Sequence, residues 1–237
     1  MAADNPTWTR RRIAAELGRL GHDVSKDTVA TYMPRASPPS RPRAAADRQT
    51  WATFVRNHLG ATLAIDFLTV PSLSFGVVYV FFVLSLERRR VLHVNVTSAP
   101  SAAWTAQQIV EAVGPDFEAK RLIRDRDGIY GAAFDKRVRS LGIEQLRTAP
   151  RSPWQNGYAE RWVGTLRREL LDHVIPLGER HLLRLVRQHA VYYNDDRPHM
   201  ALAGDAPAHR PVEPPERGEV VALPRVGGLH HRYSRAA

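Results

Sequence analysis

Three apolar segments follow one another closely in the first half of the chain, and they constrain the fold more than any other feature. They span residues 63–69 (LAIDFLT), 76–86 (GVVYVFFVLSL) and 91–97 (VLHVNVT), and each is rich in β-branched or aromatic residues and bounded by turn residues. Such segments predict β-strands. Because the gaps between them are short, consecutive strands should pair as antiparallel neighbours, so we expect a three-stranded meander in one sheet.

Strands and helices alternate after this meander. Helical patterns cover residues 102–113, 132–141, about 154–172 and 179–194, and short apolar strands cover residues 121–124 and 143–146. A meander followed by such an alternation predicts an α/β domain with a mixed five-stranded sheet and helices on its faces. This is the RNase H-like arrangement.

Composition divides the chain into four segments. Residues 34–50 are rich in proline, serine and arginine and have few apolar side chains, so they predict a solvated linker. Residues 1–33 precede the linker as a small helical segment, and residues 51–207 hold the patterned α/β core. Residues 208–237 form a basic, proline-rich tail, which predicts an irregular or small β appendage.

The N-terminal segment has the pattern of a helix-turn-helix unit. Apolar residues at helical spacing predict one helix within residues 6–20, and Ser25 stands as the N-cap of a second helix over residues 26–33. In such a unit the second helix enters the major groove of DNA, which makes Lys26 and Thr28 candidate DNA contacts. The pattern also fits a plain helical pair. The first helix starts so early that we expect a truncated recognition region.

Charge and composition indicate a polyanion as partner. The formal net charge is +10, and arginine, whose planar guanidinium suits phosphate contacts, far outnumbers lysine. The chain has no cysteine, which excludes disulfides and thiolate metal sites and leaves oxygen or imidazole ligands. The longest apolar run, residues 75–86, is too short to span a bilayer as a helix, and no signal sequence is evident. We therefore expect a cytoplasmic protein without a membrane partner.

Two aspartates stand in or directly after apolar strands. Asp66 interrupts the strand at residues 63–69, and Asp125 follows the strand at residues 121–124. A buried carboxylate is costly unless it is paired or coordinated, and strand ends of one sheet can converge. The two acids are therefore candidates for a shared cation site. The alternative is that each accepts hydrogen bonds from backbone amides.

Glu160 is the third acid, on the helix expected from about residue 154. The apolar stripe of that helix, which includes Trp162, leaves Glu160 roughly 100° to one side, together with Gly164 and Arg167. A face with an acid, a small residue and a base fits a helix that lies beside a metal site and a phosphate backbone. A solvated glutamate among arginines is the plain alternative.

Three motifs resemble the integrase catalytic core of bacterial insertion-sequence DDE transposases, a family related to retroviral integrases. They are Asp66-Phe67, the block TAPRSPWQNGYAERWVGTLRREL at 148–170, and YYNDDRPHMAL at 192–202. The family has an acid on the first strand, an acid after the fourth and a glutamate on a later helix; here 58 residues separate Asp66 from Asp125, and 34 separate Asp125 from Glu160. The resemblance covers about residues 51–207. It implies an RNase H-like fold with Asp66, Asp125 and Glu160 as catalytic metal ligands.

One departure from the family concerns the second acid. The family commonly has Ser-Asp-Asn-Gly, with a large ring two residues later, where this chain has Arg124-Asp125-Arg126-Asp127-Gly128-Ile129-Tyr130. An alignment without gaps on Tyr130 places Asp125 at the catalytic position and Asp127 where glycine usually stands. We therefore expect Asp125 to be the ligand, with Asp127 as the alternative.

The resemblance also implies cofactors, a reaction and partners. Two Mg²⁺ or Mn²⁺ ions would support donor-end cleavage by water and attack of the freed 3′-hydroxyl on target DNA, so DNA strand cleavage and transfer is the expected activity. Pairing two element ends implies a homo-oligomer assembled on DNA, at the nucleoid. An inactive DNA-binding remnant and a metal-dependent nuclease without strand transfer are the alternatives.

Other residues of the central block are candidate DNA contacts. Gln155, Asn156 and Gly157 precede the helix, where free backbone amides can bind phosphate. Asn156 could instead cap the helix. Arg167 and Arg168 lie further along the same helix and complete this set.

The histidines do not form a recognisable motif. His58, His93, His173, His181 and His189 are scattered over the core. Because they share no metal-ligand spacing, the sequence predicts no zinc site.

Overall fold

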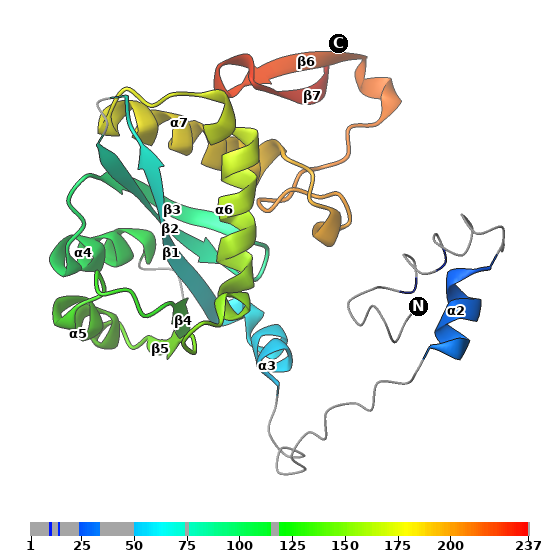
Figure 1. The fold of residues 1–237 in the computed structure, drawn as a ribbon. Helices are drawn as coiled ribbons and strands as arrows, with labels where there is room; N and C mark the ends of the chain where they lie inside the picture. Colours follow the sequence, from blue (N-terminus) through cyan, green and yellow to red (C-terminus); the bar gives the residue numbers. More distant parts are fainter. Residues whose placement is uncertain are drawn as a thin grey trace. The chain divides into compact units, whose positions relative to one another are not determined.

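The structure is a computed structural model that describes Arg10, Ala14 and residues 24–33, 50–73, 76–114 and 119–236. Contacts divide the chain into two compact units, Met1–Arg48 and Gln49–Ala237 (Figure 1). Apart from Arg10, Ala14 and Thr50, the helix expected within residues 6–20 and the linker expected at 34–50 lie outside the described residues.

Helix α2 (Lys26–Tyr32) belongs to the first unit. The side-chain oxygen of Ser25 accepts a hydrogen bond from the backbone amide of Thr28, as an N-cap does. Asp27 lies in the first turn, where the positive end of the helix dipole favours an acid. The N-cap and the second helix predicted from the sequence are confirmed.

The second unit contains a mixed five-stranded sheet in the order β3-β2-β1-β4-β5. Its strands are β1 (Thr62–Pro71), β2 (Val77–Ser85), β3 (Arg90–Thr97), β4 (Arg121–Arg124) and β5 (Glu144–Arg147). β1, β2 and β3 form an antiparallel meander, whereas β4 pairs in parallel with β1, and β5 in parallel with β4. The predicted meander and mixed sheet are thus confirmed.

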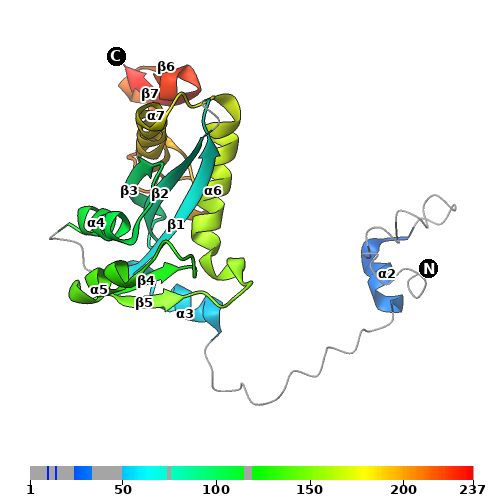
Figure 2. The same ribbon diagram turned by 60° about the vertical axis from the view of Figure 1, so that its left-hand side comes forward.

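Helices cover both faces of this sheet. They are α3 (Trp51–Asn57), α4 (Ala102–Ala112), α5 (Ala132–Ser140), α6 (Gly157–Glu169) and α7 (Glu179–Val191), with 3-10 turns at Leu59–Ala61, Pro153–Asn156, Leu171–His173, Met200–Leu202, Pro215–Arg217 and Val226–Gly228. Figure 2 shows the sheet between α4 and α5 on one side and α6 on the other. None of the described helices is long and apolar enough to cross a membrane.

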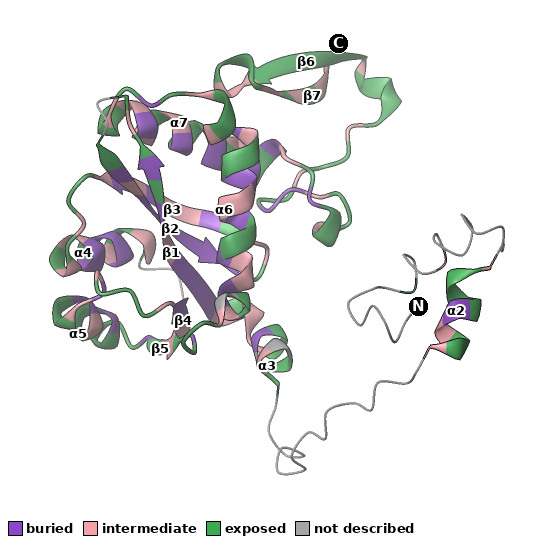
Figure 3. Cartoon of the chain, in the orientation of Figure 1, coloured by how far each residue is buried: buried purple, intermediate pink, exposed green. Residues whose placement is uncertain are grey.

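The two faces have separate apolar cores. Phe81 of β2 and Phe134 of α5 are fully buried in one core, while Phe82 of β2 packs in the other against Trp162 of α6 with ring centroids 4.2 Å apart. Figure 3 shows the strands as the most continuously buried part of the unit. The sheet is therefore a rigid support for side chains at its edges.

Two helices differ from the sequence prediction. The helix expected over about 154–172 begins as a 3-10 turn and ends at Glu169, because Leu170 has the non-helical angles φ −136° and ψ −62°. Leu170 is fully buried, so its packing outweighs its helix propensity. The helix expected over 179–194 ends at Val191 and continues as a π-helical turn, Tyr192–Asp196.

The C-terminal tail contains a β-hairpin of β6 (Glu219–Arg225) and β7 (His230–Ala236). Arg225 and Arg232 donate hydrogen bonds of 2.6 and 3.0 Å to Asp196, whose side chain is only 2% exposed. These charge-assisted bonds hold the hairpin against the π-helical turn of the core. The sequence predicted either irregular structure or a small β element for the tail, and the structure shows the β element.

Candidate active site

The strand register brings two of the predicted acids level with each other. Ala64 of β1 pairs with Ile123 of β4 in parallel, so the same register extended by two residues sets Asp66 beside Asp125. The two are equivalent positions on neighbouring parallel strands, and side chains alternate between faces along a strand. Ala64 and Ile123 both belong to the core under α6, so both aspartates belong to that face of the sheet.

Helix α6 brings the third acid to the same place. Its buried residues Ala159, Trp162 and Leu166 pack on the sheet and leave Glu160 exposed at the side of the helix. Asp66, Asp125 and Glu160 all line one open cavity of about 540 Å³. The convergence predicted from the sequence is therefore observed, with each acid coming from a different element.

Electrostatic repulsion is built into this cavity. The pKa of Asp66 is raised to about 7, mainly because the side chain is buried, and the charges of Asp125 and Glu160 raise it further. The Phe67 backbone amide opposes this increase, since it donates a 2.8 Å hydrogen bond to the carboxylate. Among the described residues, none of the three acids forms an ion pair within 4.0 Å. Their ligand atoms are not gathered as a group within 4.8 Å of one another.

The geometry distinguishes Asp125 from Asp127. Asp125 directly follows β4 and is half-buried, and its carboxylate accepts a 3.1 Å bond from the backbone amide of Asp127. Asp127 is exposed in the following turn, where its carboxylate accepts a 3.0 Å bond from the amide of Ile129. Both acids line the cavity, but only Asp125 stands at the strand position level with Asp66.

Two buried polar residues position this arrangement. Arg124 donates to the backbone carbonyl of Asp125 at 2.9 Å and forms a 2.8 Å ion pair with Asp135 of α5, so it anchors the backbone next to the second acid. Asn156 donates to the backbone carbonyl of Ile65 at 3.1 Å and thereby ties the start of α6 to β1, beside Asp66. The Asn156 side chain makes no helix-cap hydrogen bond, so it does not have the capping role that the sequence allowed.

The other candidate DNA contacts belong to several elements of the chain. Arg167 lines the cavity with Arg126 and Arg151, whereas Gln155 and Gly157 line an adjacent cavity of about 600 Å³ that also contains Arg56, Arg89 and Arg161. Asn156 lines both cavities. Arg168 is exposed on α6, and Lys26 and Thr28 are exposed on α2 in the first unit.

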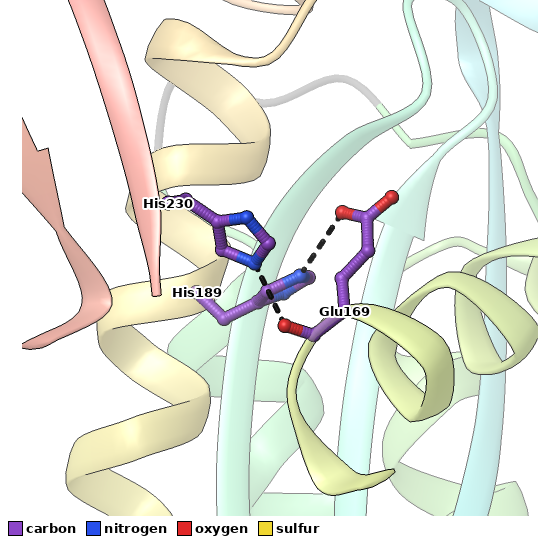
Figure 4. A group of neighbouring side chains, drawn as sticks. All are labelled: Glu169, His189 and His230. Atoms are coloured by element: carbon purple, nitrogen blue, oxygen red, sulfur yellow. Dashed lines mark hydrogen bonds and ion pairs between the residues drawn. The ribbon is translucent and has the colours of Figure 1, made fainter. Parts of the chain in front are cut away.

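The structure brings together two histidines and a glutamate that the sequence analysis did not link. Glu169, His189 and His230 bring ligand atoms within 4.8 Å of one another (Figure 4). Local spacing could not reveal this cluster, because its members come from the end of α6, the last turn of α7 and the C-terminal hairpin. Its only signal in the sequence was a histidine in an otherwise apolar helical stripe, at His189.

Comparison with known families identifies part of the core. Residues 141–207 match a family model described as Integrase core domain. The matched segment contains Glu160, while Asp66 on β1 and Asp125 directly after β4 precede it. The match confirms the resemblance to an integrase core that the three sequence motifs indicated.

A curated relative points the same way. The chain is 28% identical over 136 residues to "Putative transposase InsD for insertion element IS2E" of Escherichia coli (strain K12). The alignment covers 54% of this chain and 62% of the relative, so the chain spans less than two thirds of that protein's length.

Two solved structures share the fold. A chain of the simian T-cell lymphotropic virus intasome in complex with PP2A regulatory subunit B56 gamma matches with a TM-score of 0.52 and 13% identity, over 73% of this chain and 66% of that one. The catalytic domain of Mos1 mariner transposase matches with a TM-score of 0.51 and 11% identity, over 60% of this chain and 77% of that one. The sheet with flanking helices is thus the RNase H-like core found in integrases and transposases, as predicted.

Proposed function

We propose that this protein, which carries an integrase core domain, is a DDE transposase that cleaves and joins DNA strands. The observation that carries the proposal is the convergence of Asp66, Asp125 and Glu160 in one cavity without any described ion-pair partner. The name of the sequence relative and the shared core fold support the same activity.

The donor set of the cavity fits hard divalent cations. Carboxylate oxygens are the ligands that Mg²⁺ and Mn²⁺ prefer, and a cation would relieve the burial and mutual repulsion that raise the pKa of Asp66. Asp66, Asp125 and Glu160 would hold these ions, since all three line the cavity and none has an ion-pair partner among the described residues. When bound, such ions activate the attacking oxygen and stabilise the leaving oxygen of an in-line phosphoryl transfer.

The chain's own basic residues would bind and orient DNA. Arg126, Arg151 and Arg167 line the acidic cavity, where they can neutralise phosphates next to the reacting phosphodiester. Gln155, Asn156 and Gly157 at the start of α6, with Arg168 further along it, would extend this contact. Phosphate contacts position DNA without reading its sequence, so recognition of the element ends is assigned to the N-terminal unit, through Lys26 and Thr28 of α2.

The reaction itself implies how the protein assembles. Two element ends must be paired and joined to a target, which requires more than one active site, so we expect a homo-oligomer on DNA. A nuclease would use the same three carboxylates without joining strands. An inactive remnant would keep only the basic surface.

The proposal is tested with the full chain and labelled DNA that carries the ends flanking its gene. We expect cleaved and joined products with Mg²⁺ or Mn²⁺, and no product with EDTA or with Asp66→Asn, while salt-sensitive DNA binding persists in both proteins. Cleaved products without joined ones would favour the nuclease. DNA binding by the wild type without any product would favour the remnant and refute the proposal.

A further inference from the structure

A second group of potential metal ligands lies at the far end of α6. Glu169 is the last residue of that helix, His189 lies in α7 and His230 begins β7, so three separate elements meet there (Figure 4). One ligand atom from each residue lies within 4.8 Å of the other two. Glu169 is nine residues after Glu160, about 13 Å along the helix, so this cluster is separate from the acidic cavity.

His189 is the unexplained member of this group. Its side chain is fully buried, and neither ring nitrogen has a hydrogen-bond partner. The nearest acid, Glu169, places its Oε2 atom 3.6 Å from Nε2, beyond hydrogen-bonding distance. Buried polar groups without partners are rare in folded proteins because they cost free energy.

The other two residues have partners that hold them in place. Arg197 donates three hydrogen bonds of 2.7 to 3.1 Å to the Glu169 carboxylate. His230 donates from Nε2 to the backbone carbonyl of Glu169 at 2.7 Å and stacks on Tyr192 at 4.5 Å. Helix capping and packing account for His230 and Glu169, but they do not account for His189.

We propose that Glu169, His189 and His230 bind one divalent transition-metal ion, with Zn²⁺ as the ion that fits best. Two imidazoles and one carboxylate form a donor set that Zn²⁺ accepts and that Mg²⁺, which prefers oxygen and water, does not. Tetrahedral zinc places its ligand atoms about 3.3 Å apart, so the largest approach needed from the present positions is roughly 1.5 Å. Coordination through Nε2 of His230 would replace its hydrogen bond to the helix carbonyl.

The surroundings suit such a site. Arg197 orients the Glu169 carboxylate from outside, as hydrogen-bonded neighbours do for metal ligands. An ion held there would link the C-terminal hairpin to α6 and α7. Bound metal would therefore stabilise the folded chain, with the hairpin as the most affected element.

The chain provides a matched control for the test, because His231 is exposed on the same strand next to His230. Full-length wild type, His230→Ala, His231→Ala and Glu169→Gln are stripped of metal and titrated with Zn²⁺ in competition with a chromophoric chelator. Wild type and His231→Ala should bind one ion with equal affinity, and His230→Ala and Glu169→Gln should bind at least roughly tenfold more weakly. Zn²⁺ should raise the Tm of only the first two proteins.

Two outcomes would overturn the proposal: equal affinity of His230→Ala and His231→Ala, or wild type without a bound ion. Far-UV circular dichroism confirms that each variant is folded, and Glu169→Gln tests the site without altering the hairpin. The Glu160→Gln variant should bind Zn²⁺ like the wild type. That result separates this site from the acidic cavity, so failure of the proposed transposase function would leave it standing.

Discussion

The two ends of helix α6 carry glutamates in opposite surroundings. Glu160, in the first turn, is exposed, forms no ion pair with any described residue and shares a cavity with Asp66 and Asp125. Glu169, at the last residue, is half-buried and held by Arg197 at 2.7 Å. One helix thus presents an unpaired acid to a cluster of like charge and a paired acid to the protein interior.

This difference distinguishes carboxylates that form ion pairs within the fold from carboxylates that have no ion-pair partner among the described residues. Asp196 follows the pattern of Glu169, since it is buried and paired with Arg225 and Arg232. The acids around Glu160 have no such partner, and burial, with a further contribution from the charges of Asp125 and Glu160, raises the pKa of Asp66. Unpaired acids of this kind, in a cavity, are typical of functional sites.

The largest expected effect tests which aspartate belongs to the unpaired set. Asp125→Asn should lower the rate of Mg²⁺-dependent cleavage on the order of 10³-fold, because it removes a metal ligand. Asp127→Asn should stay within roughly tenfold of the wild type, since Asp127 lies exposed in the turn. Initial rates at equal concentrations of folded protein measure both effects. The reverse order would transfer the ligand role to Asp127.

A smaller effect compares the two glutamates through stability. Glu169→Gln should lower the free energy of unfolding by about 1–3 kcal/mol, because Arg197 loses its charged partner in a site that is only partly solvated. Glu160→Gln should leave stability unchanged or raise it, since it removes a repulsive charge. Urea unfolding in the presence of EDTA provides both values. Equal destabilisation by the two variants would contradict the description of Glu169 as a paired acid and Glu160 as an unpaired one.

The pH dependence of stability sharpens the same contrast at Asp66. Its pKa is about 7 in the folded chain and near its ordinary value when unfolded, so the folded state retains a proton between about pH 4 and 7 that the unfolded state has lost. Metal-free stability should therefore fall as pH rises through this window, by at most about 1.4 kcal/mol per pH unit from this group. Asp66→Asn should lack this contribution. Urea unfolding at several pH values tests it, and identical profiles would contradict the raised pKa.

The smallest effect concerns a hydroxyl beside the acids. The Tyr130 hydroxyl is buried and has no hydrogen-bond partner, and burial and the charges of Asp66 and Asp125 raise the pKa of this group. Tyr130→Phe should therefore change the free energy of unfolding by less than about 1 kcal/mol, because no hydrogen bond is lost. Thermal unfolding measures the change. A loss well above this value would show that the hydroxyl is bonded to a carboxylate.

Local sequence patterns were sufficient to predict the sheet and the convergence of the three acids. β1 alternates between two cores, and Asp66 in β1 and Asp125 directly after β4 are brought level by the parallel pairing of these strands. Glu160 was recognisable because the apolar stripe of α6 leaves it to one side. Hydrophobic periodicity and the order of strands along the chain are local or nearly local properties, so they can be predicted from a single sequence.

Contacts between distant segments could not be predicted in this way. Asn156 bonds to Ile65 across 91 positions, and His230 reaches Glu169 across 61, with no periodic signal linking either pair. The end of α6 at Leu170 likewise depends on burial, which outweighs a good helix propensity. The sequence therefore indicated which acids lie together, but it did not indicate these long-range contacts or the cluster at the other end of the helix.

The most direct test of the central claim is the rate of Mg²⁺-dependent strand cleavage by Glu160→Gln, measured on a protein whose folding has been verified by urea unfolding. The account predicts a loss on the order of 10³-fold with DNA binding retained and with stability equal to or above that of the wild type. Cleavage within roughly tenfold of the wild-type rate would contradict the assignment of Glu160, and with it the carboxylate site as the centre of the activity.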